Sequence, residues 1–345
     1  MRSLAAIALF GAMAASSSSA AAGGSQNQEL LYVCIQDDAK IAVVDMGARE
    51  VDRIIDLTTM GFAPTAKPHF VVVEPDGSNW YVSLIGENRI LKFNRQDEIV
   101  GFFEMEAPGM MALAGDSHLV ASRSMSAVNP PSRIGLVERV TMEGEEVEVM
   151  FPRPHPMVVG DGFAYTGSLG VNQLATVSIA DARAAITDIP GPMHSLVQFA
   201  ISPDGATLVG SGDLSGQLLI FTLADPAAPR FMRAIDVGRM AFDPTFSHDG
   251  RWLWVPVKSS NDIAVFNTST WAETTRIRSE AFRQPHQVIF SADGSTAFVT
   301  TNNKPMSSNE GGPASLVIVD VPSGQVATSI ELGRNLTGMG TRPHR

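Results

Sequence analysis

Three histidines stand at equivalent positions of a repeated pattern, each directly after a proline. The segments read KPH ending at His69, RPH ending at His155 and QPH ending at His286. Neutral imidazole is the commonest protein ligand for copper, zinc and iron, and its nitrogen can act as a general base near neutral pH. If the rings meet, they can hold copper or a haem-like cofactor, or form a catalytic site without a cofactor. If they stay apart, each ring only hydrogen-bonds nearby backbone.

This position, called the slot below, holds other residues in the remaining repeats: Met110 or Met111, Val197, Phe242 and Thr337. The methionines near it, together with Met306, would add the soft thioether sulfurs that copper prefers. His194 lies slightly upstream of its slot, and we group it with the three slot histidines as a candidate ligand-binding residue.

Polar and basic side chains gather on loops that we expect beside the slots. Two of these loops, Ser122–Ser132 and Asn302–Ala314, are unusually long, and long loops on a rigid scaffold often carry recognition. The candidate ligand contacts are Arg123, Asn302, Asn303, Lys304 and, from a shorter loop, Lys258. The three cations among them predict a local basic patch for an anionic ligand. Alternatively, the long loops contact only solvent.

The elements that would position these residues are strands that recur seven times. The recurring segments are KIAVVDM at Lys40, RILKFN at Arg89, RIGLVE at Arg133, QLATVS at Gln173, QLLIFT at Gln217, DIAVFN at Asp262 and SLVIVD at Ser315. Their spacing of roughly 40 to 50 residues is the period of a β-propeller blade. Because one four-stranded blade cannot bury both faces, blades stack until the ring closes. The sequence therefore predicts an all-β fold, a seven-bladed β-propeller with four-stranded blades.

A tight turn with Asp-Gly or a close relative recurs in phase with these strands. It appears as EPDG ending at Gly77, SPDG at Gly205, SHDG at Gly250 and SADG at Gly294. Asp hydrogen-bonds its own backbone and Gly accepts a positive φ, so these segments predict hairpin turns. The first repeat lacks its first strand, and we expect the C-terminal residues 333–345 to supply that strand and close the ring.

The segments WYVSLIGENRILKFN and AFVTTNNKP, each after an Asp-Gly-type turn, resemble the YVTN-repeat β-propellers. The resemblance covers nearly the whole chain after its N-terminal segment, although the strands LVASRS, AYTGS and LVGSGD depart from the motif. It implies seven blades and an exported or surface location. It also implies kinship in fold with the haem d1 domain of nitrite reductase, the N-terminal domain of nitrous-oxide reductase and the propeller lactonases.

The N-terminus predicts export. In residues 1–22, Arg2 is followed by a short apolar run and then by small residues, as in a cleaved signal peptide. Residues 23–29 indicate a flexible mature N-terminus and residues 30–345 the propeller domain. No later stretch is long and apolar enough for a membrane span, so we expect a periplasmic or secreted protein. With a net charge of −11, the protein lacks the excess of basic residues typical of nucleic-acid-binding proteins.

Composition and motifs exclude several kinds of site. Cys34 is the only cysteine of the 345 residues, which excludes an internal disulfide, a cysteine-based zinc site and an iron–sulfur cluster. A C-x-x-C-H motif for covalent haem is absent, as are the P-loop, the Rossmann fingerprint and the nucleophile elbow.

Three functions stay open at this point. The first is a scaffold that binds a small molecule or a periplasmic or extracellular protein at the channel mouth. The second is a redox-related protein that holds copper or a haem-like cofactor through His69, His155 and His286. The third is a lactonase-like hydrolase with a histidine as its base.

Overall fold

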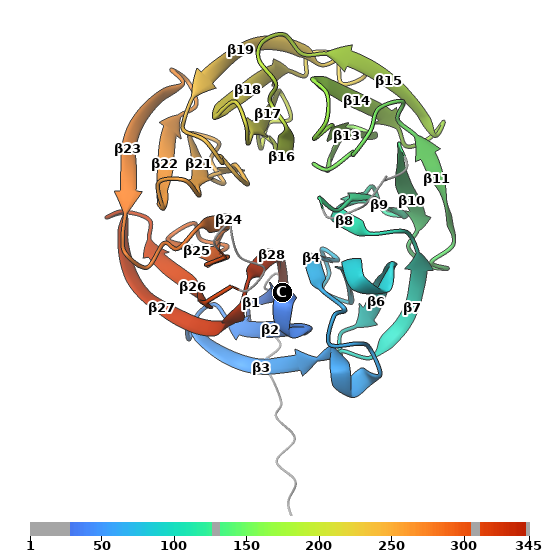
Figure 1. Ribbon diagram of the computed structural model, residues 1–345, viewed down its shortest axis with the longest axis vertical. Helices are drawn as coiled ribbons and strands as arrows, with labels where there is room; N and C mark the ends of the chain where they lie inside the picture. The colour runs from blue at the N-terminus through green and yellow to red at the C-terminus, as the bar shows by residue number, and fades with distance from the viewer. Residues whose placement is uncertain (1–27, 126–131, 305–310, 343–345) are drawn as a thin grey trace, which may run out of the picture.

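The computed structural model describes residues 28–125, 132–304 and 311–342. These residues form seven four-stranded antiparallel sheets arranged as blades around a central channel (Figure 1). Helix within the described ranges is limited to three short 3₁₀ segments, Gln36–Asp38, Leu57–Met60 and Ile85–Glu87. The fold is the predicted seven-bladed β-propeller. The predicted signal peptide, residues 1–22, and most of the segment 23–29 lie outside the described residues.

Each blade runs from an inner strand at the channel to an outer strand at the rim. Blades 1 to 4 contain β28 (Leu336–Arg342), β1 (Leu30–Ile35), β2 (Lys40–Asp45), β3 (Glu50–Asp56); β4 (Pro68–Val73), β5 (Asn79–Leu84), β6 (Arg89–Asn94), β7 (Ile99–Glu104); β8 (Pro108–Ala114), β9 (His118–Arg123), β10 (Arg133–Glu138), β11 (Gly144–Glu148); β12 (Val158–Gly160), β13 (Phe163–Gly167), β14 (Gln173–Ser178), β15 (Arg183–Asp188). Blades 5 to 7 contain β16 (Leu196–Ile201), β17 (Thr207–Gly212), β18 (Gln217–Thr222), β19 (Arg230–Asp236); β20 (Thr245–Phe246), β21 (Trp252–Val257), β22 (Asp262–Asn267), β23 (Ala272–Arg278); β24 (Pro285–Phe290), β25 (Thr296–Thr301), β26 (Pro313–Asp320), β27 (Gln325–Arg334).

The segment that recurs in the sequence is the third strand of each blade. All seven copies are confirmed as β2, β6, β10, β14, β18, β22 and β26. These strands are almost continuously buried because they lie between neighbouring strands and between neighbouring blades; β2, for example, has only its two end residues partly exposed. Their unbroken apolar character is therefore explained by burial on both faces.

The Asp-Gly turns join the first and second strands as predicted. Asp204 and Asp293 each accept hydrogen bonds from a serine hydroxyl two residues earlier, at 2.5 and 2.6 Å, and from a backbone N–H two residues later. The glycine that follows has a φ of 73° in Gly205 and 70° in Gly294, a conformation that side chains disfavour. The side chain and the glycine together fix the hairpin.

The C-terminal strand closes the ring. In β28, Thr341 pairs with Leu31 and Met339 pairs with Val33, so the chain's last strand becomes the inner strand of the first blade (Figure 1). This pairing agrees with the predicted closure and covers the inner edge of β1, which would otherwise expose unpaired backbone groups.

Apolar side chains fill the spaces between blades. Trp80 stacks on Phe93 with ring centroids 4.1 Å apart and lies 4.9 Å from Tyr32 of the neighbouring blade. Cys34 is completely buried in this packing, as expected for an inert core thiol. Within the described ranges, no helix has the length and hydropathy needed to cross a bilayer.

Candidate functional site

The chain turns into the channel at the same point of every blade. A non-glycine residue in the left-handed region precedes each slot: Lys67, Ala107, Arg153, Ser195, Met240, Gln284 and Asn335, with φ between 42° and 58°. In six blades the slot residue follows two positions later, and in the third blade Met110 follows three positions later. Residues in this region carry a conformational cost that is usually retained where it positions a functional group.

The slot residues also lie in interruptions of the sheet. In blade 2, Pro68 pairs with Leu84 and Phe70 pairs with Ser83, which leaves His69 without a partner residue. In blade 7 the ladder likewise skips from Pro285 to Val288. Such bulges redirect a side chain and are common next to active sites. They explain why His69 and His286 point into the channel instead of into the space between blades.

A hydroxyl on the second strand completes each of three bulges. The Oγ of Ser83 accepts from the backbone N–H of Phe70 at 3.2 Å and donates to the carbonyl of Gly109 in the next blade at 2.8 Å. Ser122 and Thr300 repeat this arrangement, donating to the carbonyls of slot residues His155 and Thr337. The hydroxyl therefore satisfies the N–H that the bulge leaves free and ties each slot to its neighbour.

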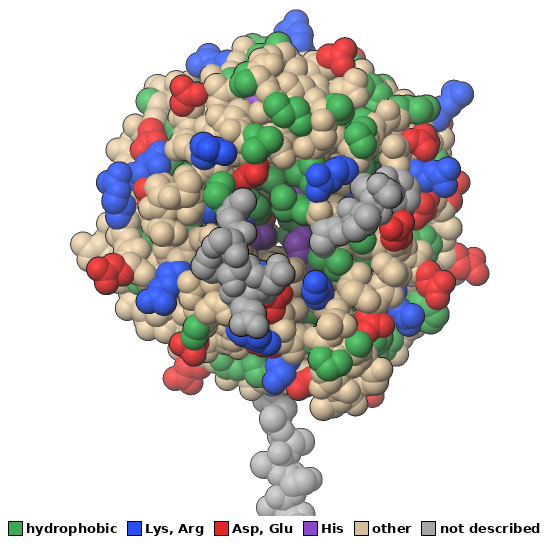
Figure 2. Space-filling model, viewed as in Figure 1, with side chains coloured by type: hydrophobic (Ala, Val, Ile, Leu, Met, Phe, Trp, Pro, Cys, Tyr) green, Lys and Arg blue, Asp and Glu red, His purple; other side chains and the backbone are tan. Residues whose placement is uncertain are grey.

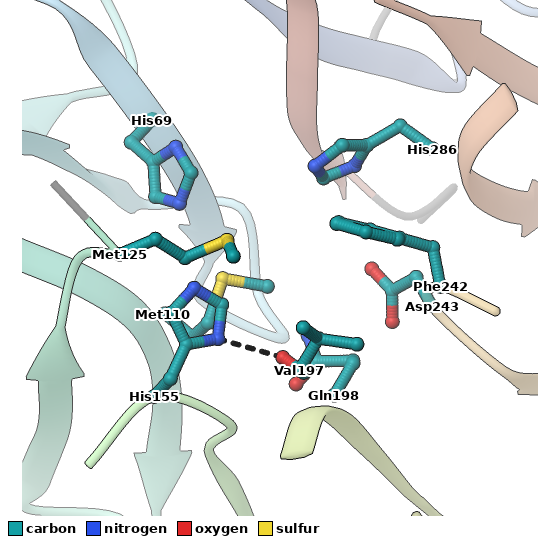
Figure 3. Close-up of a pocket in the computed structure, with 9 residues that line it drawn as sticks. All are labelled: His69, Met110, Met125, His155, Val197, Gln198, Phe242, Asp243 and His286. Atoms are coloured by element: carbon teal, nitrogen blue, oxygen red, sulfur yellow. Dashed lines mark hydrogen bonds between the residues drawn. The ribbon is translucent and has the colours of Figure 1, made fainter. Parts of the chain in front are cut away.

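The slots converge on one pocket in the channel (Figure 3). Its lining consists of His69, Met110, Met125, His155, Val197, Gln198, Phe242, Asp243 and His286, around a cavity of about 20 Å³. Six of these nine are slot residues, so side chains from blades 2 to 7 meet here. Histidine side chains are visible at the bottom of the central opening (Figure 2). A cavity of this volume has room for about one water-sized species, which favours a single ion or a molecule of very few atoms.

His69 and His155 are the closest pair of imidazoles, with ring centroids 6.5 Å apart. The Nδ1 of His155 lies 2.7 Å from the carbonyl oxygen of Val197, so this nitrogen must carry the proton and donate it. The Nδ1 of His69 lies 2.7 Å from the side-chain oxygen of Gln36 and donates to it in the same way. Both Nε2 atoms are then left as lone-pair acceptors, and both are buried without a partner. Figure 3 shows these two Nε2 edges turned toward each other.

His286 enters from the other side of the pocket. Its ring is 4.9 Å from the ring of Phe242, and its Nδ1 is buried without a hydrogen-bond partner. The ammonium group of Lys258 lies 3.2 Å from the centre of the same Phe242 ring. Lys258 does not itself line the pocket, and Phe242 links it to the pocket wall.

Asp243 adds a carboxyl group beside His286. Its side chain is 5% exposed and its Oδ2 has no hydrogen-bond partner. Burial raises the pKa of Asp243 to about 8, although the Gln198 amide and Lys258 favour the ionised form. Asp243 is thus mainly protonated at neutral pH and can donate a proton into the pocket.

The histidines are held neutral. Burial lowers the pKa of His69 to about 3, helped by His155 and Lys258. Burial likewise lowers the pKa of His155 to about 4, against the hydrogen bond to Val197, and it depresses the pKa of His286 well below its usual value. Burial also depresses the pKa of Lys258, against the opposing influence of Asp213 and Asp243. Several perturbed titratable groups around one cavity are typical of functional sites.

His194 lies apart from this pocket. It is completely buried, its Nε2 lies 3.0 Å from the carbonyl of Pro190, and its Nδ1 lies 3.0 Å from the Ser215 hydroxyl. With both nitrogens occupied, His194 holds the loop between the fourth and fifth blades. The predicted grouping of this ring with the three slot histidines has no counterpart in the pocket lining.

The remaining predicted contacts mostly serve the fold. Arg123 is 1% exposed and forms an ion pair with Glu146 at 2.5 Å. Asn302 donates to the carbonyl of Leu336 at 2.7 Å, Asn303 donates to the carbonyl of Pro313 at 2.6 Å, and the Lys304 ammonium contacts Asp37 at 2.8 Å. Of the five predicted polar and basic contacts, Lys258 alone lies next to the pocket wall. The predicted basic patch of Arg123, Lys258 and Lys304 is not brought together there.

Sequence reasoning missed Gln198, Asp243 and Met125. Gln198 and Asp243 directly follow the slot residues Val197 and Phe242, in repeats whose slots themselves carry no polar side chain. The polar residue directly after each of these slots was the feature of the sequence that could have indicated a pocket contact. Met125 belongs to the long loop that starts after β9, and the rest of that loop, residues 126–131, lies outside the described residues, as does Met306.

The donor set limits the kinds of metal that the pocket can take. Among the described residues, no group of three or more His, Cys, Asp or Glu side chains is arranged to hold a metal ion. Three imidazoles and two thioethers do line one space, however. Thioether and imidazole ligands suit copper, whereas zinc sites use thiolate, imidazole and carboxylate.

Comparisons with known proteins show the fold alone. No family model and no curated protein match the chain, so membership of the YVTN-repeat family stays a prediction. A periplasmic gluconolactonase of Pseudomonas aeruginosa, PpgL, is similar in structure with a TM-score of 0.70 and 17% identity, over 92% of this chain and 99% of that one. A functionally unknown protein from Desulfotomaculum acetoxidans is similar with a TM-score of 0.68 and 16% identity, over 92% of this chain and 99% of that one. The dihydro-haem d1 dehydrogenase NirN is similar with a TM-score of 0.59 and 13% identity, over 90% of this chain and 74% of that one.

Proposed function

We propose that the protein is an exported binding propeller that captures a small ligand in the channel pocket. One observation carries this proposal: buried polar atoms without partners surround a single space, namely the Nε2 atoms of His69 and His155, Nδ1 of His286 and Oδ2 of Asp243. An unpaired buried polar group costs about 1–3 kcal/mol. Such groups are retained where a ligand or ordered water completes their hydrogen bonds.

The size and charge of the site limit the class of ligand. The cavity of about 20 Å³ favours an ion or a water-sized molecule over a haem-like cofactor. The net charge of −11 argues against nucleic acid as a partner. Export is supported by the signal-peptide pattern of residues 1–22 and by the similar fold of PpgL, whose name places that protein in the periplasm. A periplasmic or extracellular protein would deliver or accept the ligand at the channel mouth.

The test compares ligand occupancy in protein purified from its native cells. Wild type, the double variant His69→Gln/His155→Gln and the control His118→Gln are examined by native mass spectrometry and elemental analysis. His118 hydrogen-bonds Ser117 at a turn outside the pocket lining, so the control keeps the pocket intact. The proposal expects a bound mass or metal in wild type and the control and its loss in the double variant. Equal occupancy in all three proteins, or none in any, overturns it.

A second candidate is a lactonase-like hydrolase. It is favoured by the placement of a mainly protonated carboxyl, Asp243, in the same pocket as neutral imidazoles, since hydrolysis of a cyclic ester needs an acid and a base. One structural neighbour is named a gluconolactonase. Hydrolysis of gluconolactone that falls at least 100-fold in both His155→Gln and Asp243→Asn would support this candidate. Hydrolysis at the buffer rate by wild type would remove it.

A further inference from the structure

We propose that the pocket binds a single cuprous ion between the Nε2 atoms of His69 and His155, with the sulfurs of Met110 and Met125 completing its coordination. The inference rests on the proposed function and names its ligand. All four side chains line the same pocket. In the view of Figure 3, both sulfur atoms lie beside the gap between the two imidazoles.

The two imidazoles are already arranged as ligands. A metal-bound histidine usually donates its other ring N–H to a carbonyl or carboxylate, which fixes the tautomer. Val197 supplies this acceptor for His155 and Gln36 supplies it for His69, each at 2.7 Å. The two Nε2 atoms left free are on side chains only 2% and 8% exposed. The hydrogen bonds thus leave one lone pair on each ring available to an ion.

The separation of the rings fits one bridging ion. A metal–nitrogen bond of about 2.0 Å on each side, plus a ring radius of about 1 Å, spans about 6 Å between centroids. The observed separation is 6.5 Å. An ion between His69 and His155 therefore requires movements of only a few tenths of an ångström, which imidazole side chains make without a change of rotamer.

The donor types select a soft cation. Thioether sulfur is a weak ligand for zinc, magnesium and manganese but a good ligand for Cu(I). Met110 is 2% exposed and contributes from the pocket wall, whereas Met125 is 38% exposed and covers the pocket from its outer side.

The test is a competition for Cu(I) between the full mature protein, stripped of metal, and the chromophoric chelator bicinchoninate under anaerobic, reducing conditions. Wild type should withdraw one equivalent of Cu(I) from the chelator. His69→Gln and His155→Gln should each weaken binding at least 100-fold, and Met110→Leu about tenfold or more. Met111→Leu is the matched control, because Met111 is equally buried in the same strand but does not line the pocket. That variant should bind Cu(I) as wild type does.

X-ray absorption at the copper edge provides the second readout. Wild type should show both nitrogen and sulfur neighbours around copper, with sulfur lost in the Met110→Leu/Met125→Leu double variant. Circular dichroism checks that each variant is folded. The single variant Met125→Leu changes an exposed side chain and leaves the core unchanged. Failure to withdraw Cu(I), retention by both histidine variants, or a spectrum without sulfur overturns the copper assignment. If protein from native cells carries a ligand other than copper, and His69→Gln/His155→Gln releases it, the copper assignment fails while the proposed function stands. If protein from native cells carries no ligand and does not withdraw Cu(I), both fail.

Discussion

His69 and His155 each have one ring nitrogen that is hydrogen-bonded and one that is free. This division is what separates them from His194, whose two nitrogens both have partners. A buried imidazole with a single partner stays neutral and offers a lone pair, while one with two partners is a structural element. The two kinds of histidine thus differ in the hydrogen-bond partners around the ring and not in burial.

Removal of the acceptor behind His69 tests this view. We expect Gln36→Leu to weaken capture of the pocket ligand by 10- to 100-fold, because the ring loses the contact that fixes its tautomer. Gln36 does not line the pocket, so a direct contact with the ligand is not removed. Cu(I) competition measures the effect. An unchanged affinity would show that Gln36 does not orient the ring.

Asp243 gives a pH-dependent prediction. Burial raises its pKa to about 8, so between pH 4 and pH 8 the folded protein keeps a proton that the unfolded chain releases. The free energy of unfolding attributable to this group therefore falls as the pH rises through that window. Asp243→Asn removes the dependence, and we expect its stability relative to wild type to rise by more than about 1 kcal/mol from pH 5 to pH 8. Denaturant unfolding at both pH values measures it, and parallel profiles for the two proteins would contradict it.

At the scale of the element, the bulge and the hydroxyl opposite it form one unit. Ser83, Ser122 and Thr300 stand where the YVTN-type strand carries its hydroxyl residue. Each accepts an N–H freed by the bulge and donates to the next blade. The resemblance that indicated the fold thus also marks the hydrogen bonds that hold the slots in place.

Loss of one hydroxyl should destabilise the protein and disturb the pocket together. We expect Ser122→Ala to cost about 1–3 kcal/mol, because a buried N–H and the carbonyl of His155 lose their partner. The matched control is Ser269→Ala, whose hydroxyl lies in an exposed turn, and it should cost less than about 0.5 kcal/mol. Chemical denaturation compares the two. Equal costs would refute a special role for the inner hydroxyl.

The Asp-Gly turns give the hairpins an acid-sensitive component. Hydrogen bonds from Ser291 and from the Ser295 backbone and side chain lower the pKa of Asp293 to about 2. Folded protein therefore holds this group ionised where the unfolded chain takes up a proton, and its contribution is lost as the pH falls from about 4 to about 2. We expect the melting temperature of Asp293→Asn to fall less than that of wild type between about pH 4 and about pH 2. A melting curve against pH, identical in shape for variant and wild type, would speak against it.

At the scale of the whole molecule, much of the architecture was predictable because the blade repeats. The repeat length of the blade predicted the positions of the seven third strands and of the Asp-Gly turns. The register from turn to slot placed His69, Val197, Phe242 and His286 at one depth in the channel, where the structure finds them in one pocket. Repetition makes each copy a check on the others, which is why the prediction of the fold succeeded.

The ligand-contact predictions drawn from loop position had a weaker basis. Arg123 ends the second strand β9, whereas Asn302, Asn303 and Lys304 follow β25. Their side chains bond neighbouring backbone or an acidic partner. Sequence position shows which end of a strand a residue occupies but not whether its side chain faces the channel. For Asp243, the missing information was the irregular pairing of its segment, in which the bridge from Ala241 to Val257 is followed only at Thr245 and Trp254. Phe242 and Asp243, although consecutive, both line the pocket.

Ring closure should dominate global stability. A chain that ends at Asn335 loses β28 and leaves β1 without its inner partner. Loss of the fully buried Leu336 and Met339 alone should cost about 2–5 kcal/mol each, so we expect a large fall in melting temperature. A chain that ends at Arg342 retains the strand and serves as the control. Equal melting of the two chains would contradict closure by β28.

The most direct test of the central claim is a crystal structure of the protein purified from its native cells without added ligand, with anomalous data at the copper edge. We expect electron density for a bound ion or small ligand within bonding distance of Nε2 of both His69 and His155. An anomalous peak there would identify copper, and its absence with ligand density present would leave binding intact with another ligand. A pocket that contains only ordered water bridging the imidazoles and Asp243 would contradict the claim that this propeller captures a ligand in its channel.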